Sequence, residues 1–169
     1  MIEIFNSNEY RVYMDREALV FKPNGANARV LILTPPGIKP QFYSILAVLL
    51  VKFNVEVVIP RFPLPCSEDG LKNFINKLIS NYRPDLTVMM GFDLGNAYGR
   101  RLVVGFDEEA YVTQLTHSRV PGSVYVVNEN CRWVRPAVAN ADIVIKGGLT
   151  LDAVVKIRDS VLGLIQANR

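Results

Sequence analysis

Short runs of apolar, mainly β-branched residues alternate along the chain with longer segments in which apolar residues recur every three or four positions. Continuous apolar runs are typical of parallel strands buried on both faces, and the helical period indicates the helices that connect them. We expect strands at residues 30–33, 55–59, 86–90, 124–127 and 143–145, and a weaker one at residues 111–115. This order predicts an α/β fold, a three-layer sandwich around a mainly parallel sheet.

Two helices are indicated by a cap as well as by an apolar stripe. Ser67 precedes Glu68 and Asp69, and a hydroxyl cap followed by acidic residues is typical of a helix start. Thr150 begins the last helical segment in the same way. A further helix, at residues 42–53, is apolar nearly all round, so we expect one face to be covered by something beyond its own sheet. A homodimer contact would supply that cover.

The first 28 residues follow a different pattern. Two strands, at residues 2–5 and 11–21, flank the polar residues 6–8, and residues 23–25 form a second turn signal, Pro-Asn-Gly. We expect an antiparallel hairpin at the sheet edge. No repeat or linker divides the sequence, which predicts one domain, with the hairpin in residues 1–28 and a βα core in residues 29–169.

Composition narrows the class of protein. The chain has 169 residues, half of them hydrophobic, and its net charge of +3 comes without basic runs, so we expect no nucleic-acid binding. Residues 42–53 are far short of the roughly 20 needed to span a bilayer, so we expect no membrane association. No secretory signal is visible, and a cytoplasmic location is expected. Five arginines, at positions 61, 100, 101, 132 and 135, are expected to be ordinary solvated residues.

Metal and cofactor chemistry has little support in the sequence. The chain contains only two cysteines, Cys66 and Cys131, and a single histidine, His117, none of them in a metal-ligand spacing. We therefore expect no metal and no cofactor. Both cysteines follow predicted strands at the same sheet edge, so a disulfide between them is an open alternative.

Residues 88–97 hold the strongest candidate motif. They have the form strand, Gly-x-Asp-x-Gly, helix, with Asp93 at the centre. In a nucleophile elbow the central residue occupies a strained strand-to-helix turn, and the flanking glycines make room for it. The alternative is that Asp93 simply caps the following helix and that Gly91 and Gly95 shape an ordinary loop.

Three further segments, taken in order with this motif, resemble the α/β-hydrolase family. Residues 30–37 look like the strand and loop that supply part of the oxyanion hole, and residues 55–63 are similar to the next strand and its Asp-x-Pro-Gly-type loop. Residues 124–136 resemble the segment that carries the acid of the catalytic triad. The resemblance implies that Asp93 stands at the nucleophile position, as in haloalkane dehalogenases and epoxide hydrolases.

The rest of the triad departs from the family pattern. The acid position is occupied by Cys131, or by Asn130 if the match shifts by one residue, and neither carries a fixed negative charge. The loop around Gly148, where the family has its histidine, contains none. Water that attacks an ester on Asp93 needs a proton acceptor, and His117, expected just beyond strand 111–115, is the one histidine available. Glu108 and Glu109 are expected to be solvated.

The oxyanion loop is altered as well. Pro35 and Pro36 have no N–H to donate, which leaves Gly37 or Ile38 together with Leu94. No cap domain precedes the acid strand, so a shallow, open crevice is expected. Its lining would consist of these residues, Asp93, Phe62 and Trp133, although Trp133 is also suited to packing over the core.

Three functional hypotheses follow. The first is a catalytically degenerate hydrolase-like protein that binds a small molecule or a protein partner at the carboxyl rim of the sheet. The alternative is an active hydrolase of small esters, halides or epoxides, in which Asp93 is the nucleophile or base and His117 assists. The third is a nucleotide-binding domain, although the chain lacks both G-x-G-x-x-G and the P-loop pattern.

Overall fold

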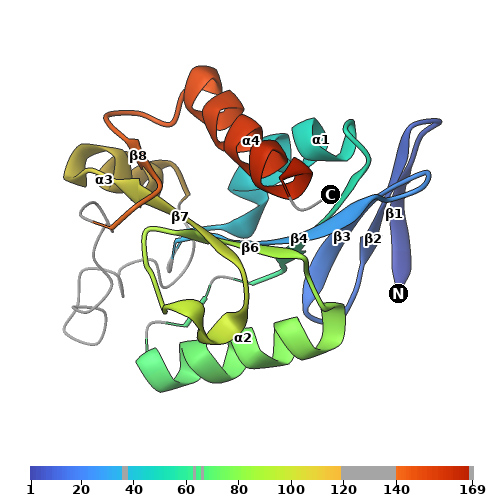
Figure 1. The fold of residues 1–169 in the computed structure, drawn as a ribbon, viewed down its shortest axis with the longest axis horizontal. Helices are drawn as coiled ribbons and strands as arrows, with labels where there is room; N and C mark the ends of the chain where they lie inside the picture. Colours follow the sequence, from blue (N-terminus) through green and yellow to red (C-terminus); the bar gives the residue numbers. More distant parts are fainter. Residues whose placement is uncertain (36–37, 63, 66, 119–139, 168–169) are drawn as a thin grey trace.

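A single sheet joins all the strands in the described part of the chain (Figure 1). The computed structural model describes residues 1–35, 38–62, 64–65, 67–118 and 140–167, with side chains in the third helix described as far as residue 114. The sheet has eight strands in the order β1-β2-β3-β5-β4-β6-β7-β8. They are β1 (Ile2–Asn6), β2 (Tyr10–Met14), β3 (Ala18–Pro23), β4 (Ala28–Leu33), β5 (Val55–Pro60), β6 (Leu86–Met90), β7 (Arg101–Phe106) and β8 (Ile143–Ile145).

The sheet is antiparallel at its N-terminal side and parallel elsewhere. Strands β1, β2 and β3 pair antiparallel, and β3 pairs antiparallel with β5. From β5 through β4, β6 and β7 to β8 every pairing is parallel. The mainly parallel α/β fold with an N-terminal antiparallel hairpin is therefore confirmed. One predicted strand, residues 11–21, is in fact two, because the chain turns at residues 15–17 between β2 and β3.

Helices cover both faces of the sheet, which gives the three layers (Figure 1). One core cluster joins the sheet to α1 (Ser44–Val51), to the start of α3 (Glu108–Ser118) and to α4 (Leu151–Gln166). A second cluster joins the opposite face to α2 (Glu68–Tyr82). Consecutive residues of β4 alternate between the clusters, Val30 and Ile32 in the first and Leu31 and Leu33 in the second, as the period of a strand requires.

Both predicted caps begin their helices. The Ser67 hydroxyl accepts a hydrogen bond from the Gly70 amide at 3.3 Å, and the Thr150 hydroxyl accepts one from the Ala153 amide at 3.2 Å. The apolar segment predicted as a helix at residues 42–53 forms a short 3-10 helix, η1 (Pro40–Tyr43), followed by α1. Helix α4 packs against α1, so this chain supplies part of the cover expected from elsewhere.

One predicted strand is wrong and one strand was missed. Residues 111–115 lie in α3, because the Asp107 carboxylate accepts a hydrogen bond from the Ala110 amide at 2.8 Å and so caps a helix. The missed strand is β7, which runs between β6 and β8. The strand predicted at residues 124–127 lies outside the described residues.

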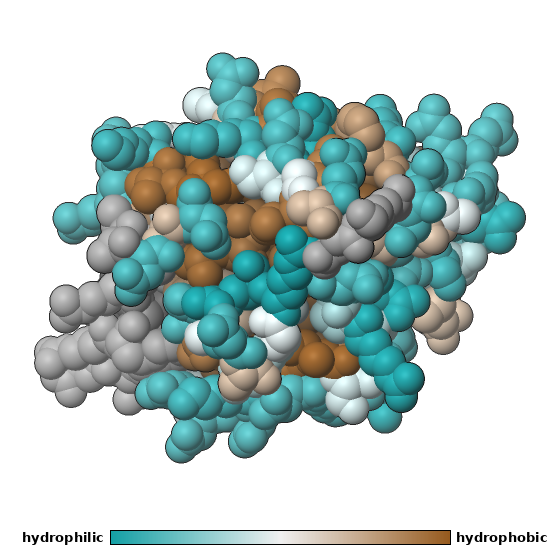
Figure 2. Space-filling model, viewed as in Figure 1, coloured by the Kyte–Doolittle hydropathy of each residue, from teal (hydrophilic) through white to brown (hydrophobic). Residues whose placement is uncertain are grey.

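The surface in Figure 2 is mostly hydrophilic, with apolar residues gathered mainly along the middle of the view, where the strands lie. Of the helices in the described ranges, none combines the length and the apolar character needed to cross a membrane.

Candidate functional site

The loop that carries Asp93 does not lead into a helix as predicted. After β6 ends at Met90, residues 91–100 contain only the three-residue 3-10 helix η2 (Asn96–Tyr98) before β7 begins. Gly91, Gly95 and Gly99 have φ of 79°, 81° and 89°, and Asp93 is not among the residues with positive φ. Glycines in this left-handed region interrupt an α-helix. The glycine spacing is therefore that of a loop between two adjacent strands.

The Asp93 carboxylate is occupied by partners within its own loop and strand. Arg101, the first residue of β7, places Nε 2.7 Å from Oδ1 and Nη2 3.2 Å from Oδ2. The Gly95 amide donates to Oδ1 at 2.8 Å. The Arg101 guanidinium also donates to the Asn96 side-chain oxygen, which ties η2 to the pair. Arg101 was expected to be solvated, whereas it is three-quarters covered and holds this loop.

This environment fixes the charge of Asp93. The Arg101 guanidinium, and to a smaller extent the Gly95 amide, lower the pKa of the Asp93 carboxyl below its ordinary value, against an opposing effect of partial burial. A general base that works near neutral pH requires a raised pKa, and a nucleophile requires free lone pairs. The pKa of Asp93 is lowered and not raised, and three hydrogen bonds occupy its carboxylate, as in a structural ion pair.

The structure places the other described site residues in different surroundings. The Ile38 amide donates to the Pro35 carbonyl at 3.0 Å, so it is engaged within its own turn, and the Ile38 side chain is buried. Leu94 packs against the core cluster on the α2 face. Phe62 is exposed, and the centroid of its ring lies 5.1 Å from the Arg61 guanidinium carbon. Gly148 is exposed, with no heavy atom of another residue close to the position of a Cβ.

Several predicted residues lie wholly or partly outside the described part of the chain. Gly37, Trp133, Cys131 and Cys66 are among them, so their roles remain predictions. The backbone of His117 lies in α3 and not beyond the end of a strand, and its side chain is not among those described. Glu108 and Glu109 are exposed in the first turn of α3, as expected.

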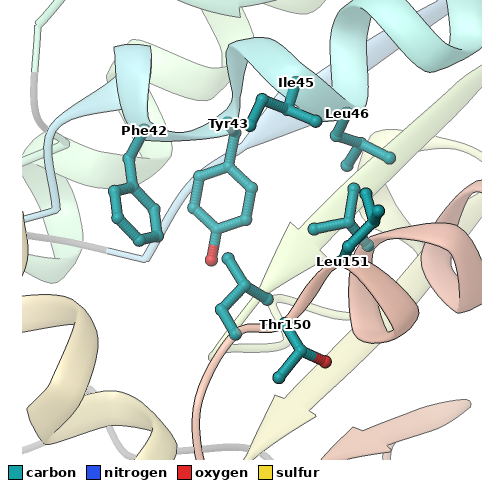
Figure 3. A pocket seen from close by; sticks show the side chains of 8 residues that line it. Phe42, Tyr43, Ile45, Leu46, Thr150 and Leu151 are labelled. Atoms are coloured by element: carbon teal, nitrogen blue, oxygen red, sulfur yellow. The ribbon is translucent and has the colours of Figure 1, made fainter.

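An apolar groove of about 360 Å³ opens at another point of the carboxyl rim (Figure 3). One wall comes from η1 and the start of α1, which follow β4, and the other from the loop after β8 and the start of α4. The lining residues are Phe42, Tyr43, Ile45, Leu46, Leu149, Thr150, Leu151 and Val154. The Phe42 and Tyr43 rings extend from η1 toward Thr150, with Leu151 facing Leu46 and Ile45. Ile45 and Leu151 are more than half exposed.

The polar atoms of the lining side chains are already bonded. The Tyr43 hydroxyl donates to the side-chain oxygen of Gln114 in α3, and both side chains are buried. The Gln114 amide group donates in turn to the Ala110 carbonyl at 3.3 Å. Burial raises the pKa of Tyr43 well above its ordinary value, so this hydroxyl stays protonated. Together with the Thr150 cap, these bonds leave the groove apolar and without charge.

One polar side-chain atom near the rim has no partner among the described residues. Thr34, immediately after β4, is fully buried, and its Oγ1 makes no hydrogen bond to a described residue. A buried hydroxyl without a partner costs free energy. Thr34 is not part of the groove lining.

Metal chemistry has no site in the described ranges, where no group of three or more His, Cys, Asp or Glu side chains comes together. The groove carries no carboxylate, thiol, imidazole or cationic side chain that would hold a charged cofactor.

No protein-family model matches the chain, and no curated protein matches it. Among solved structures, the chain is similar to TT1662 from Thermus thermophilus, with a TM-score of 0.47 and 11% sequence identity, over 93% of this chain and 98% of that one.

Sequence reasoning missed the groove and the Asp93–Arg101 pair. The loop and the strand that hold the pair had a signal in the sequence, because three glycines at intervals of four, followed by the apolar run of β7, predict a loop and then a strand. The groove had none, because its two walls are distant in sequence and meet only when α1 packs against α4.

Proposed function

We propose that this chain is a catalytically degenerate α/β-hydrolase-like domain that binds a neutral, apolar small molecule in the groove between α1 and α4. The site is at the carboxyl rim, where ligands of open α/β sheets bind, because both walls follow the carboxyl ends of parallel strands. This groove, and not the crevice expected around Asp93, would then be the binding site.

The bidentate contact of Arg101 with Asp93 is the observation that carries the absence of catalysis. A carboxylate with a lowered pKa is a weak base near pH 7, and the two contacts with Arg101 compete with any substrate for its oxygens. The strained strand-to-helix turn of a nucleophile elbow is also missing at this position.

The composition of the groove supports the ligand class. A charged ligand would lose its hydration against Phe42, Leu46 and Val154 without gaining a partner, which costs several kcal/mol. An apolar ligand gains about 25 cal/mol for each Å² removed from water. The volume lies within the usual range for small-molecule sites.

A titration with the neutral fluorescent probe N-phenyl-1-naphthylamine tests the binding. Ile45→Glu and Leu151→Glu each place a charge at the rim of the groove. Both positions lie in the first turn of a helix, α1 or α4, where the helix dipole favours an acidic residue, so the helices should tolerate the change. We expect each to weaken binding about tenfold or more, as an uncompensated charge does. Phe53→Glu, at an exposed apolar position beyond the groove, is the matched control and leaves affinity unchanged.

The hydrolase alternative is tested separately with a panel of small esters, epoxides and haloalkanes. We expect no turnover by the unmodified protein. Turnover that Asp93→Asn abolishes would show that the domain is an active hydrolase. Equal probe binding by Ile45→Glu, Leu151→Glu and the control Phe53→Glu would show that the probe does not bind in the groove.

A further inference from the structure

Both walls of the groove are bonded to the first part of α3, although none of the described side chains of this helix lines it. From one wall, the Tyr43 hydroxyl donates to the side-chain oxygen of Gln114. From the other, the Gly147 amide in the loop after β8 donates to the carboxylate of Asp107, with 3.2 Å to each oxygen. In Figure 3 the Tyr43 ring extends from the first wall toward Thr150 of the second. The walls therefore share a support in addition to the packing of α1 against α4.

Asp107 makes several contacts at once, because it lies between the end of β7 and the start of α3. Its Oδ1 accepts a hydrogen bond from the Ala110 amide at 2.8 Å, which caps α3, and the same oxygen lies 3.2 Å from the Gly147 amide. The Asp107 amide donates to the Ile145 carbonyl at 3.0 Å and so continues the pairing of β7 with β8. One residue thus joins the start of α3 to the point where the chain leaves β8.

The loop that Asp107 holds is short and forms part of the second wall. It consists of residues 146–150, between β8 and α4, and its Leu149 and Thr150 line the groove. Gly147 has a φ of 73°, in the left-handed region that favours glycine, and it carries no side chain that could pack. The bond from its amide to Asp107 therefore fixes the turn that leads to Leu149.

We propose that Asp107 is a positioning residue of the groove, which raises the affinity for an apolar ligand without touching it. The inference rests on the function proposed above. Gln114 holds Tyr43 and Asp107 holds the loop before Leu149, so the same helix sets the distance between the two walls. A preformed groove binds more tightly than one whose wall must be ordered by the ligand, because that ordering costs conformational entropy.

Titration of the full chain with N-phenyl-1-naphthylamine tests this role. Asp107→Ser keeps an oxygen that can cap α3, as Ser67 caps α2, but on a shorter side chain that no longer reaches Gly147. We expect it to weaken binding about fivefold, as the loss of one hydrogen bond does. Asp107→Asn has an amide oxygen in the place of Oδ1, which accepts from both amides, and is expected to restore most of the affinity.

The control for a general loss of stability is Ser67→Ala. It removes the cap of α2, which covers the opposite face of the sheet, and is expected to leave the affinity for the probe unchanged.

Amide hydrogen exchange of the unmodified protein gives a second measurement, which stands even if a variant fails to fold. Coupling between two sites is reciprocal, so a bond that favours the ligand is favoured by the ligand to the same extent. We expect saturating probe to slow exchange of the Gly147 amide about as much as Asp107→Ser weakens binding. The Gly70 amide, which is bonded to Ser67 at the start of α2, is expected to exchange at an unchanged rate.

The results distinguish this inference from the function on which it rests. Absence of probe binding to the unmodified protein would overturn both. Probe binding that Ile45→Glu weakens but Asp107→Ser does not, or that Asp107→Asn weakens as much as Asp107→Ser, would overturn the role of Asp107 and leave the groove as the binding site. Gly147 exchange that bound probe leaves unchanged would do the same.

Discussion

Arg101 contacts Asp93 with two of its nitrogen atoms, Nε at 2.7 Å from Oδ1 and Nη2 at 3.2 Å from Oδ2. The pair joins the start of β7 to the loop that leaves β6, two neighbouring parallel strands. Parallel strands usually need a longer crossover with a helix. In this chain residues 91–100 make the connection without one, and the ion pair holds the loop.

The first prediction concerns the stability that this pair supplies. Asp93→Ala and Arg101→Ala are each expected to lower the free energy of unfolding by about 1 kcal/mol, with a combined loss smaller than the sum, because the contact is bidentate and partly covered. Urea unfolding of the double-mutant cycle measures the coupling. Glu68→Gln, which removes an exposed pair with Lys72, serves as the control and is expected to leave stability almost unchanged. Additive losses at Asp93 and Arg101 would show that the pair contributes nothing.

The pH dependence of the same pair has a definite sign. The pKa of Asp93 is lowered from its ordinary value of 3.8, so the stabilisation is present above that value and is lost as the pH falls through the lower pKa of the folded state. The difference in unfolding free energy between the unmodified protein and Asp93→Asn is therefore expected to be constant above about pH 5 and to shrink below pH 4. Urea titrations at a series of pH values measure it. A difference that grows in acid would contradict the lowered pKa.

The buried bond between Tyr43 and Gln114 is expected to couple η1 to α3. Tyr43→Phe leaves the Gln114 oxygen buried without its donor, so we expect a loss of about 1 to 3 kcal/mol. Adding Gln114→Leu removes the stranded oxygen and is expected to recover part of the loss. Chemical denaturation of the single and double variants measures this, and a double variant no more stable than Tyr43→Phe would contradict it.

Thr34 provides a prediction of the opposite sign. Its buried hydroxyl has no partner among the described residues, so Thr34→Val is expected to raise stability by about 1 kcal/mol. Thr150→Val, which removes the cap of α4, is the control and is expected to lower stability by about 1 kcal/mol. Thermal and urea unfolding of both variants provide the comparison, and a destabilised Thr34→Val would show that the hydroxyl is bonded in solution.

Local signals predicted much of the fold. Strands β6 and β8 have the predicted bounds, because each is a short apolar run between polar or turn residues. The caps at Ser67 and Thr150 also act where predicted, since a hydroxyl bonds an amide only three residues away. These features depend on neighbours in the sequence.

Other features depended on competition between signals. The Tyr-Val-Thr sequence at residues 111–113 favours a strand, but the Asp107 carboxylate caps a helix and also accepts a hydrogen bond from the Gly147 amide beyond β8. Gln114 then finds a buried partner in Tyr43. Tyr43 and Gln114 are far apart in the sequence, so the local pattern could not predict their contact.

The site was the least predictable part. The spacing around Asp93 matches a nucleophile elbow, but in the structure Asp93 pairs with Arg101, eight residues later, and the glycines of the loop interrupt any helix. The groove is formed by residues 42–46 and 149–154, which meet only in the folded chain. Apolar residues at those positions are equally typical of a core.

Methyl NMR spectra recorded during titration with N-phenyl-1-naphthylamine test most directly whether the ligand binds in the groove and not beside Asp93. We expect the methyl signals of Ile45, Leu149 and Leu151 to shift with a common dissociation constant, while those of Leu94, beside Asp93, stay in place. Shifts at Leu94 together with unchanged signals from the groove would contradict the account.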